Sequence, residues 1–269
     1  MTEKNGTVIC FANNKGGVGK TTSCAALGYL LTKRGYSVLL IDADPQGNLS
    51  TRFGFDNRND MNLGSLIKNR RDDETENIMI ESYIHHCEGF KNIDIVISDL
   101  RLDGEYVSLS ADNINSTTIF RDIVYDVRML DVYDFILIDT RPALTNEVAS
   151  TFMAADWVMI PIEAGQDSIV GANNMMAFMA KCRKLNSGLK TLGVFFNRVS
   201  NRTKAFNEML PMVKGGWSSA LFETVIPQNQ SVVNAENEAL PLPYKFPSSK
   251  AAKAYEKLLD EVVKRLEQA

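Results

Sequence analysis

Short apolar segments recur along the chain, and each ends in a polar or glycine-rich turn. Most are continuous runs of β-branched and aliphatic residues without alternation, which is typical of strands that are buried on both faces. Seven of these runs are predicted to be strands, over residues 8–12, 38–41, 93–97, 135–138, 157–162, 192–196 and 221–226.

Stretches with helical spacing lie between these runs. They are predicted over residues 20–34, 117–130, 168–184 and 249–267. Because strands alternate with helices, the pattern predicts an α/β fold with a single doubly wound, mostly parallel sheet flanked by helices. Residues 56–105 are the least regular part, and we interpret them as a solvated helical excursion that contains one strand. We therefore expect a single domain over residues 1–269.

Composition narrows the class of protein. The 269 residues are 45% hydrophobic and 23% charged, which is ordinary for a globular protein and excludes disorder, collagen or coiled coil as the main architecture. A net charge of −4 excludes a uniformly basic coat for nucleic acid, although a local basic patch is compatible with it. The N-terminus lacks the pattern of a signal peptide, and no apolar stretch approaches the roughly 18 residues of a membrane span. We expect a cytoplasmic protein that does not use a membrane.

The strongest chemical signal is the segment Asn-Asn-Lys-Gly-Gly-Val-Gly-Lys-Thr-Thr over residues 13–22, which follows a predicted strand and precedes a predicted helix. Glycines allow successive backbone N–H groups to point at one anion, and the helix N-terminus adds its dipole. Lys20 can bridge the β- and γ-phosphates of a nucleotide, and the Thr21 hydroxyl can hold Mg²⁺. The predicted nucleotide-binding residues of this loop are Asn14, Gly16, Gly17, Val18, Gly19, Lys20, Thr21 and Thr22.

This loop departs from the common phosphate-loop pattern, which has glycine at position 14. The chain has Asn14 there and an additional lysine, Lys15, before two glycines. The sequence Lys-Gly-Gly-x-Gly-Lys-Thr resembles the deviant Walker A motif of the ParA/MinD family of dimerising ATPases. The resemblance implies that the cofactors are ATP and Mg²⁺. It also implies that Lys15 reaches across a dimer to the partner's nucleotide, so that Lys15 and Lys20 both take part in catalysis.

Two aspartates end the second predicted strand. The strand–helix–strand unit over residues 8–42 makes its two strands parallel, so their carboxyl ends share one edge of the sheet, where ligands bind in open α/β folds. The segment Asp-Ala-Asp-Pro-Gln-Gly-Asn, from Asp42 to Asn48, resembles the second motif of the same family. The resemblance implies that Asp44 orients the attacking water. Asp42 is expected to support either Mg²⁺ or the loop.

A third carboxylate follows four apolar residues at the end of another predicted strand. Asp139 in this position has the Walker B pattern, which holds a carboxylate near Mg²⁺. The family usually continues Asp-x-Pro-Pro in its nucleotide-sensing loop, whereas this chain has Arg141 in place of the first proline. Three alternatives are open for Arg141: it tunes hydrolysis, contacts the nucleotide or points to solvent.

The opposite end of the nucleotide is predicted from two strand ends. The run from Val225 to Asn229 resembles the adenine loop of the family, and Asn197 matches the other side of that base pocket. The resemblance therefore implies adenine contacts from Asn197, Pro227 and Asn229. The alternative is ordinary turn chemistry, because asparagine is common after a strand.

Basic residues gather between residues 168 and 207, where there are seven and no acidic ones. This asymmetry favours a local surface that contacts DNA phosphates without sequence preference, as ParA-like proteins do. A simpler alternative is compensation of a helix dipole. Glutamines at 228 and 230 stand where the family often has arginines, which argues for weaker binding or for other lysines. The predicted DNA-binding residues are Lys181, Arg183, Lys184, Arg198, Arg202 and Lys204.

The resemblance extends from Val8 to the last predicted helix and is closest to the short, Soj-like branch. It implies a homodimer with ATP, nonspecific DNA binding in that state, and hydrolysis stimulated by a ParB-like partner, all in plasmid or chromosome partition. One alternative is a MinD-like positioning ATPase, although the terminal helix is expected to be a docked core helix. Another is a nucleotide-gated binding module with little hydrolysis. A relative of the nitrogenase iron protein would need cluster cysteines that this sequence does not place in a matching motif.

Overall fold

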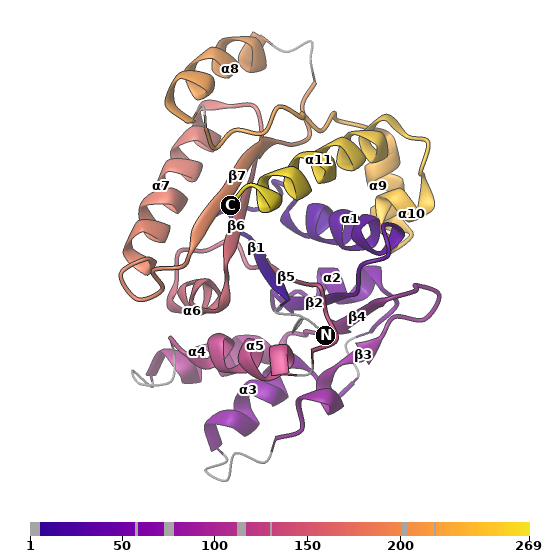
Figure 1. Cartoon of the computed structure of the whole chain (residues 1–269), viewed down its shortest axis with the longest axis vertical. Helices are drawn as coiled ribbons and strands as arrows, with labels where there is room; N and C mark the ends of the chain where they lie inside the picture. Colours follow the sequence, from indigo (N-terminus) through magenta and orange to yellow (C-terminus); the bar gives the residue numbers. More distant parts are fainter. Residues whose placement is uncertain are drawn as a thin grey trace.

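The computed structural model describes residues 6–56, 59–72, 78–111, 117–129, 131–200, 204–217 and 219–269. A seven-stranded sheet crosses this part of the chain in the order β3-β4-β2-β5-β1-β6-β7 (Figure 1). Every neighbouring pair is parallel except β3 and β4. The predicted mostly parallel sheet is therefore confirmed. Its strands are β1 (Thr7–Phe11), β2 (Val38–Ala43), β3 (His85–His86), β4 (Ile93–Val96), β5 (Phe135–Thr140), β6 (Trp157–Ile162) and β7 (Lys190–Phe196).

Helices connect the strands and cover both faces of the sheet. Along the first half of the chain these are α1 (Lys20–Lys33), α2 (Asn48–Arg52), α3 (Leu63–Asp72), the short 3-10 helix η1 (Ile80–Tyr83), α4 (Arg101–Ala111) and α5 (Ile119–Met129). Along the second half they are α6 (Asn146–Ala154), α7 (Gln166–Cys182), α8 (Lys204–Trp217), α9 (Gln230–Asn237), α10 (Leu242–Lys245) and α11 (Lys250–Glu267).

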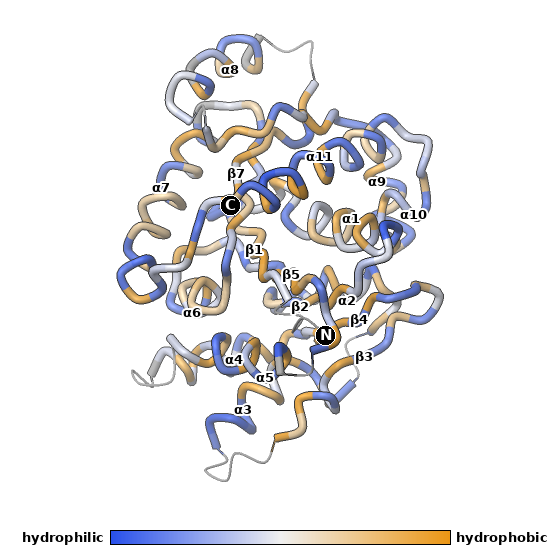
Figure 2. The backbone as a smooth tube through the Cα atoms, viewed as in Figure 1, coloured by the Kyte–Doolittle hydropathy of each residue, from blue (hydrophilic) through white to orange (hydrophobic). Residues whose placement is uncertain are grey.

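Two hydrophobic cores lie on opposite faces of the sheet. Along β1, Val8 and Cys10 join the core that also contains residues of α3 to α8, whereas Ile9 and Phe11 join the core formed with α1 and α11. Successive side chains of a strand point to opposite faces, so a strand covered on both sides must be apolar throughout. Figure 2 shows this as hydrophobic colour along the central strands. Because helices pack on both faces of one sheet, the architecture is doubly wound.

The carboxyl ends of β1, β2 and β5 are brought to one level by the register of the sheet. Asp139 pairs with Asp42 on β2 and with Phe11 on β1. From β1 the chain runs through α1 to β2 on one side, and from β5 it later runs through α6 to β6 on the other side of β1, so the strand order reverses at β1. In open α/β sheets ligands bind at this point, outside the carboxyl ends of the strands.

The predicted strand over residues 221–226 is wrong. The segment beside β7 makes only isolated bridges, between Val194 and Leu221 and between Val199 and Pro227. The N–H groups of Phe222 and Ile226 still donate to Val194 and Phe196 of β7. Between them the pairing is interrupted, because the Glu261 carboxylate of α11 accepts the N–H groups of Glu223 and Thr224 at 2.8 Å each. A backbone that bonds to side chains in this way cannot form a regular ladder.

The irregular region over residues 56–105 also differs from its prediction. It contains two strands, β3 and β4, of which β3 pairs antiparallel with β4. Its helix α3 is not a solvated excursion, because Leu63, Leu66 and Ile67 are fully buried in the core beside α4 and α5.

The C-terminal helix α11 packs on α1 as expected, with Tyr255, Leu258 and Leu259 buried. Among the described residues, no helix combines the length and apolar character that crossing a bilayer requires.

Candidate functional site

A cleft of about 620 Å³ opens at the carboxyl edge of the sheet. Its walls come from the glycine-rich loop after β1, the loop after β2 with helix α2, the loops after β5 and β7, and helices α4 and α9. Of the predicted site residues, Gly16, Gly17, Gly19, Lys20, Thr21, Thr22, Asp44, Asn197 and Arg198 line it. The fold therefore brings together segments that are nearly 200 positions apart in the sequence.

The loop after β1 needs glycine because of its own geometry and because of its neighbour. Gly17 and Gly19 have φ values of 76° and 89°, which residues with a Cβ rarely adopt. A Cβ on Gly19 would lie 2.1 Å from Nδ2 of Asn197. That Nδ2 donates to the carbonyl of Val18 at 2.8 Å, so the end of β7 braces the loop. Helix α1 begins directly afterwards at Lys20 and presents its N-terminal N–H groups to the cleft.

The two lysines of the loop have different surroundings. Lys20 is only 6% exposed, and burial lowers the pKa of its ammonium group while Asp139 and Asp44 oppose that change. Its Nζ lies 3.4 Å from the carbonyl oxygen of Lys15. Lys15 instead has a side chain that is 41% exposed, with Nζ 3.4 Å from Oε2 of Glu163. Lys20 is thus held inside the cleft, whereas Lys15 lies at its outer margin.

The carboxylate of Asp42 is fully buried and fully engaged. Its Oδ2 accepts the backbone N–H of Ser50 at 2.8 Å and the Ser50 hydroxyl at 2.7 Å, and its Oδ1 accepts the N–H of Asp44 at 3.2 Å. Burial raises the pKa of Asp42 to about 6, although these hydrogen bonds oppose the rise. Of the two alternatives for Asp42, the contacts support the loop and leave no free oxygen for a metal.

Asp139, the register partner of Asp42, is equally buried but has no hydrogen-bond partner on either oxygen among the described residues. Burial and the nearby Asp42 carboxyl raise its pKa, and the Thr21 hydroxyl and Lys20 oppose this rise. A buried carboxylate without a partner is unfavourable and is stabilised by a cation. Asp139 and Thr21 therefore fit a Mg²⁺ site, with Thr21 lining the cleft and Asp139 fully buried close to it at the end of β5.

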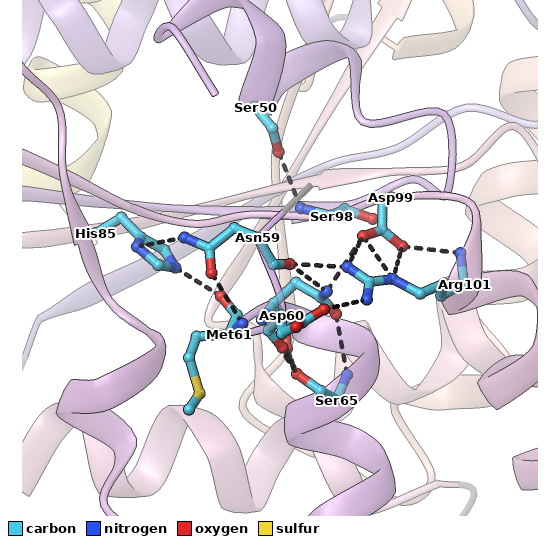
Figure 3. A network of polar contacts seen from close by, with 10 residues as sticks. Ser50, Asn59, Asp60, Met61, Ser65, His85, Ser98, Asp99 and Arg101 are labelled. Carbon is cyan, nitrogen blue, oxygen red and sulfur yellow. Dashed lines mark hydrogen bonds and ion pairs between the residues drawn. The ribbon is translucent and has the colours of Figure 1, made fainter. Parts of the chain in front are cut away.

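A polar network reaches from Ser50, at the start of α2, to the segment after β4 (Figure 3). The Ser50 hydroxyl that donates to Asp42 also accepts the N–H of Ser98, just beyond β4, at 2.9 Å. Next to it, Asp99 accepts from the Arg101 guanidinium, whose Nη1 also donates to Asp60 at 2.7 Å. The ends of β2 and β4 are thereby held together independently of any ligand.

Arg141 lies against helix α4 and lines the cleft instead of pointing to solvent. Its Nη1 donates to Asp103 at 3.0 Å, and its guanidinium carbon is 5.9 Å from the ring centre of Tyr106. The Tyr106 hydroxyl in turn donates to the carbonyl of Ala43, the residue before Asp44, at 2.9 Å. Helix α4 thus connects the loop after β5 with the loop that carries Asp44.

Adenine contacts from Asn197, Pro227 and Asn229 stay a prediction, and the three residues are placed differently relative to the cleft. The Asn197 side chain lines the cleft but is bonded to the phosphate loop, and its Oδ1 accepts the N–H of Arg198. Asn229 caps helix α9 by accepting from the backbone and hydroxyl of Ser231, and neither Pro227 nor Asn229 lines the cleft. Asn14 and Val18 do not line it either, so they can contribute only nearby or through their backbone.

Sequence reasoning missed the pair of Arg52 and Glu236 at the cleft wall. Glu236 Oε1 accepts from the Thr22 hydroxyl at 2.7 Å and from Arg52 Nη2 at 3.0 Å. Thr22 and Glu236 are 214 positions apart, and neither Arg52 nor Glu236 belongs to a motif. No signal in a single sequence could have joined them, because only the packing of α9 beside α1 does so.

The basic stretch does not form one continuous surface. Lys181, Arg183 and Lys184 lie at the end of α7, next to the start of β7, whereas Arg198 follows the end of that strand. A seven-residue strand separates these two groups by roughly 20 Å. Arg202 lies outside the described residues, as does the side chain of Lys204.

Two members of the stretch have structural contacts that the prediction did not anticipate. Arg183 donates to the carbonyl of Leu189 and to the Thr191 hydroxyl. Arg198 lies at the cleft, where its Nη1 donates to the carbonyl of Gly17 at 2.8 Å.

The position of the second arginine in the family pattern needs correction. In Pro-Arg-Asn-x-Arg, counted from Pro227, the second arginine corresponds to Ser231 and not to Gln230.

Comparisons with known proteins agree with this geometry. The family described as AAA domain matches residues 6–191. The chromosome-partitioning ATPase Soj of Treponema pallidum is 30% identical and is aligned over 97% of this chain and 98% of its own.

Solved structures share the fold. The ATP complex of a McdA variant from Cyanothece has a TM-score of 0.83 at 23% identity, covering 98% of this chain and 97% of that one. The septum site-determining protein MinD of Pyrococcus horikoshii, complexed with Mg-ADP, has a TM-score of 0.76 at 24% identity and covers 95% of both chains. The phosphate loop, the paired aspartates and the full-length match to Soj together establish that this chain belongs to the ParA/MinD family of ATPases.

Proposed function

We propose that this chain is a Mg-ATP-dependent dimerising switch that acts in plasmid or chromosome partition. The observation that carries the proposal is the position of Lys15. Gly16, Gly17 and the residues from Gly19 to Thr22 line the cleft, but Lys15 extends from its margin with a half-exposed side chain. A lysine placed in this way can reach a nucleotide held by a second copy of the chain.

The cleft residues divide the work on ATP by their chemistry. The glycine loop and the start of α1 bind the phosphates through backbone N–H groups, and the buried Lys20 contacts the terminal phosphates. Thr21 and Asp139 would hold Mg²⁺, whose positive charge would offset the negative charge of the phosphates. Oδ1 of Asp44 accepts the N–H of Gln46 at 3.0 Å, whereas no described residue donates to Oδ2, so one oxygen is available to orient water.

Nonspecific DNA is the proposed binding partner of the ATP-bound dimer. Support comes from the chromosome-partitioning relative and from the local excess of basic residues, with Lys181 and Lys184 exposed at the end of α7. A dimer carries each basic group twice, and the binding free energy grows with the number of DNA phosphates contacted. The protein would then be nucleoid-associated in its ATP state, and a ParB-like partner would stimulate hydrolysis and release it.

The proposal is tested with the hydrolysis-blocked variant Asp44→Ala. DNA binding is measured with ATP, with ADP and without nucleotide, across a series of salt concentrations. We expect binding only with ATP, and we expect it to weaken steeply as salt rises. A protein that forms an ATP dimer but binds no DNA in any state has another cargo, as a positioning ATPase does.

Paired variants locate the DNA surface. Lys181→Gln with Lys184→Gln removes charge at the end of α7, and Arg202→Gln with Lys204→Gln removes charge beyond β7. ATP-dependent dimerisation is measured for each pair as a control, so that a loss of DNA binding is separated from a loss of the dimer. The pair that contacts DNA lowers the slope of log affinity against log salt by about 2 per chain, and the other pair serves as its matched control.

A further inference from the structure

Glu163 joins two cations at the margin of the cleft. It follows β6 directly, so its carboxylate lies beside the loops that follow β1 and β7. Oε2 is 3.4 Å from Nζ of Lys15, and Oε1 is 3.7 Å from Nη1 of Arg198. None of the sequence motifs includes Glu163, and the proposed function does not use it.

The two cations are held with different strength. Nη1 of Arg198 also donates to the carbonyl of Gly17 at 2.8 Å, and the backbone of Arg198 is fixed at a φ of 55° directly after Asn197, which braces Val18. Lys15 has only the single long contact from its ammonium group to Glu163. Arg198 is therefore the anchored partner of the carboxylate, and Lys15 is the exchangeable one.

We propose that Glu163 is a positioning residue that holds Lys15 on its own chain until a dimer forms. This inference rests on the proposed function, in which Lys15 acts on the partner's nucleotide. When Lys15 leaves, Arg198 stays on Glu163, so the departure does not leave a carboxylate without a cation. The arrangement restrains the lysine while keeping its release inexpensive in free energy.

The arrangement predicts opposite effects for the two partners of Glu163. Glu163→Gln removes the restraint, so Lys15 is free and the ATP-state dimer becomes tighter. Arg198→Gln leaves Lys15 as the only cation paired with Glu163 among the described residues, so the lysine is held more strongly and the dimer becomes weaker. A partly exposed pair changes an equilibrium up to about fivefold, and a symmetric dimer releases two such lysines, so each shift reaches up to about 25-fold.

The experiment measures the monomer–dimer constant of the full chain by sedimentation velocity, with Mg²⁺ and a non-hydrolysable ATP analogue. The variants are Glu163→Gln, Arg198→Gln and both together, with Asp167→Asn as a matched control. Asp167 is an exposed carboxylate four positions further along the chain. Affinity for Mg-ADP is measured in parallel for Glu163→Gln, because a merely structural change in the loop would alter it and a restraint on Lys15 would not. This control does not extend to Arg198→Gln, because Arg198 itself lines the cleft and bonds to the phosphate loop.

The expected result is a tighter dimer for Glu163→Gln, a weaker one for Arg198→Gln, and little further change when Arg198→Gln is added to Glu163→Gln. Asp167→Asn should match the wild type. If the wild type dimerises and Glu163→Gln leaves the constant unchanged or weakens it, the role of Glu163 is overturned while the dimer switch stands. If no protein dimerises with the analogue, the switch itself is wrong and the role of Glu163 falls with it.

Discussion

Strands β2 and β5 each carry an aspartate near the carboxyl end, at the same level of the sheet, but the two carboxylates differ in their hydrogen bonds. Asp42 and Asp139 are register partners on neighbouring strands, and both are fully buried. Asp42 accepts three hydrogen bonds from Ser50 and Asp44, whereas neither oxygen of Asp139 has a partner among the described residues. One carboxylate is already satisfied by the protein, and the other still requires a cation.

This difference separates a structural role from a ligand-binding role within a single pair. The segment after Asp42 turns back into α2 and brings Ser50 over the carboxylate, while the segment after Asp139 continues into α6, with the Arg141 side chain bonded to α4. The identity of the residue therefore does not decide its role. The path of the following ten residues does.

The largest expected effect comes from removing the unsatisfied carboxylate. Asp139→Asn should lower the Mg-ATP hydrolysis rate by about 100-fold or more, because the carboxylate proposed to hold Mg²⁺ is lost. In the nucleotide-free protein the same change should leave the free energy of unfolding equal or higher, since a neutral amide replaces a buried carboxylate. Hydrolysis assays and urea unfolding measure the two quantities. Clear destabilisation would contradict the assignment, because it would reveal a structural partner for Asp139.

The matched change at the satisfied carboxylate should do the reverse. Asp42→Asn places an amide N–H against the two donors of Ser50 or leaves one of them unpaired, so we expect a loss of about 2–3 kcal/mol in the free energy of unfolding. The affinity of the folded variant for Mg²⁺, measured by isothermal titration calorimetry with ATP present, should stay within a few-fold of that of the wild type. Loss of Mg²⁺ binding without loss of stability would instead make Asp42 a metal ligand.

The pH dependence of stability sharpens the same comparison. The pKa of Asp42 is raised from 3.8 to about 6, so the folded state binds this proton more tightly than the unfolded chain. The stability from this proton is fully present below about pH 3.8 and is lost as the pH rises toward about 6. Urea unfolding of the nucleotide-free wild type should therefore weaken over this window relative to Asp42→Asn. Parallel curves for the two proteins would show that Asp42 has an ordinary pKa.

The smallest expected effect concerns Arg141. Arg141→Ala removes a partly exposed pair with Asp103, so the free energy of unfolding should change by less than about 1 kcal/mol. Hydrolysis should change more than stability does, because Arg141 lines the cleft and α4 connects it to Ala43 beside Asp44. Steady-state kinetics would record this as a change in kcat. An unchanged kcat would reduce Arg141 to a surface pair with α4.

Local sequence patterns were enough to predict most strands of the sheet and the loops after β1, β2 and β5. Continuous apolar runs predicted six of the seven sheet strands, since a strand buried on both faces admits few polar residues. The two-residue strand β3 was too short to leave such a pattern, and the apolar run over residues 221–226 became irregular because Glu261 and Arg265 take its backbone groups. An apolar run indicates burial, but it does not say which groups satisfy its backbone.

The sequence by itself determined the phosphate loop, because glycines, Lys20 and a helix start act through bonds within ten residues of one another. It also placed Asp42 and Asp139 at one edge, since parallel strands align their ends. Only the tertiary structure decided which aspartate is left without a partner, that Arg198 belongs to the cleft, and that Glu163 holds Lys15. Those outcomes depend on contacts between loops that are distant in the chain, and no local pattern records them.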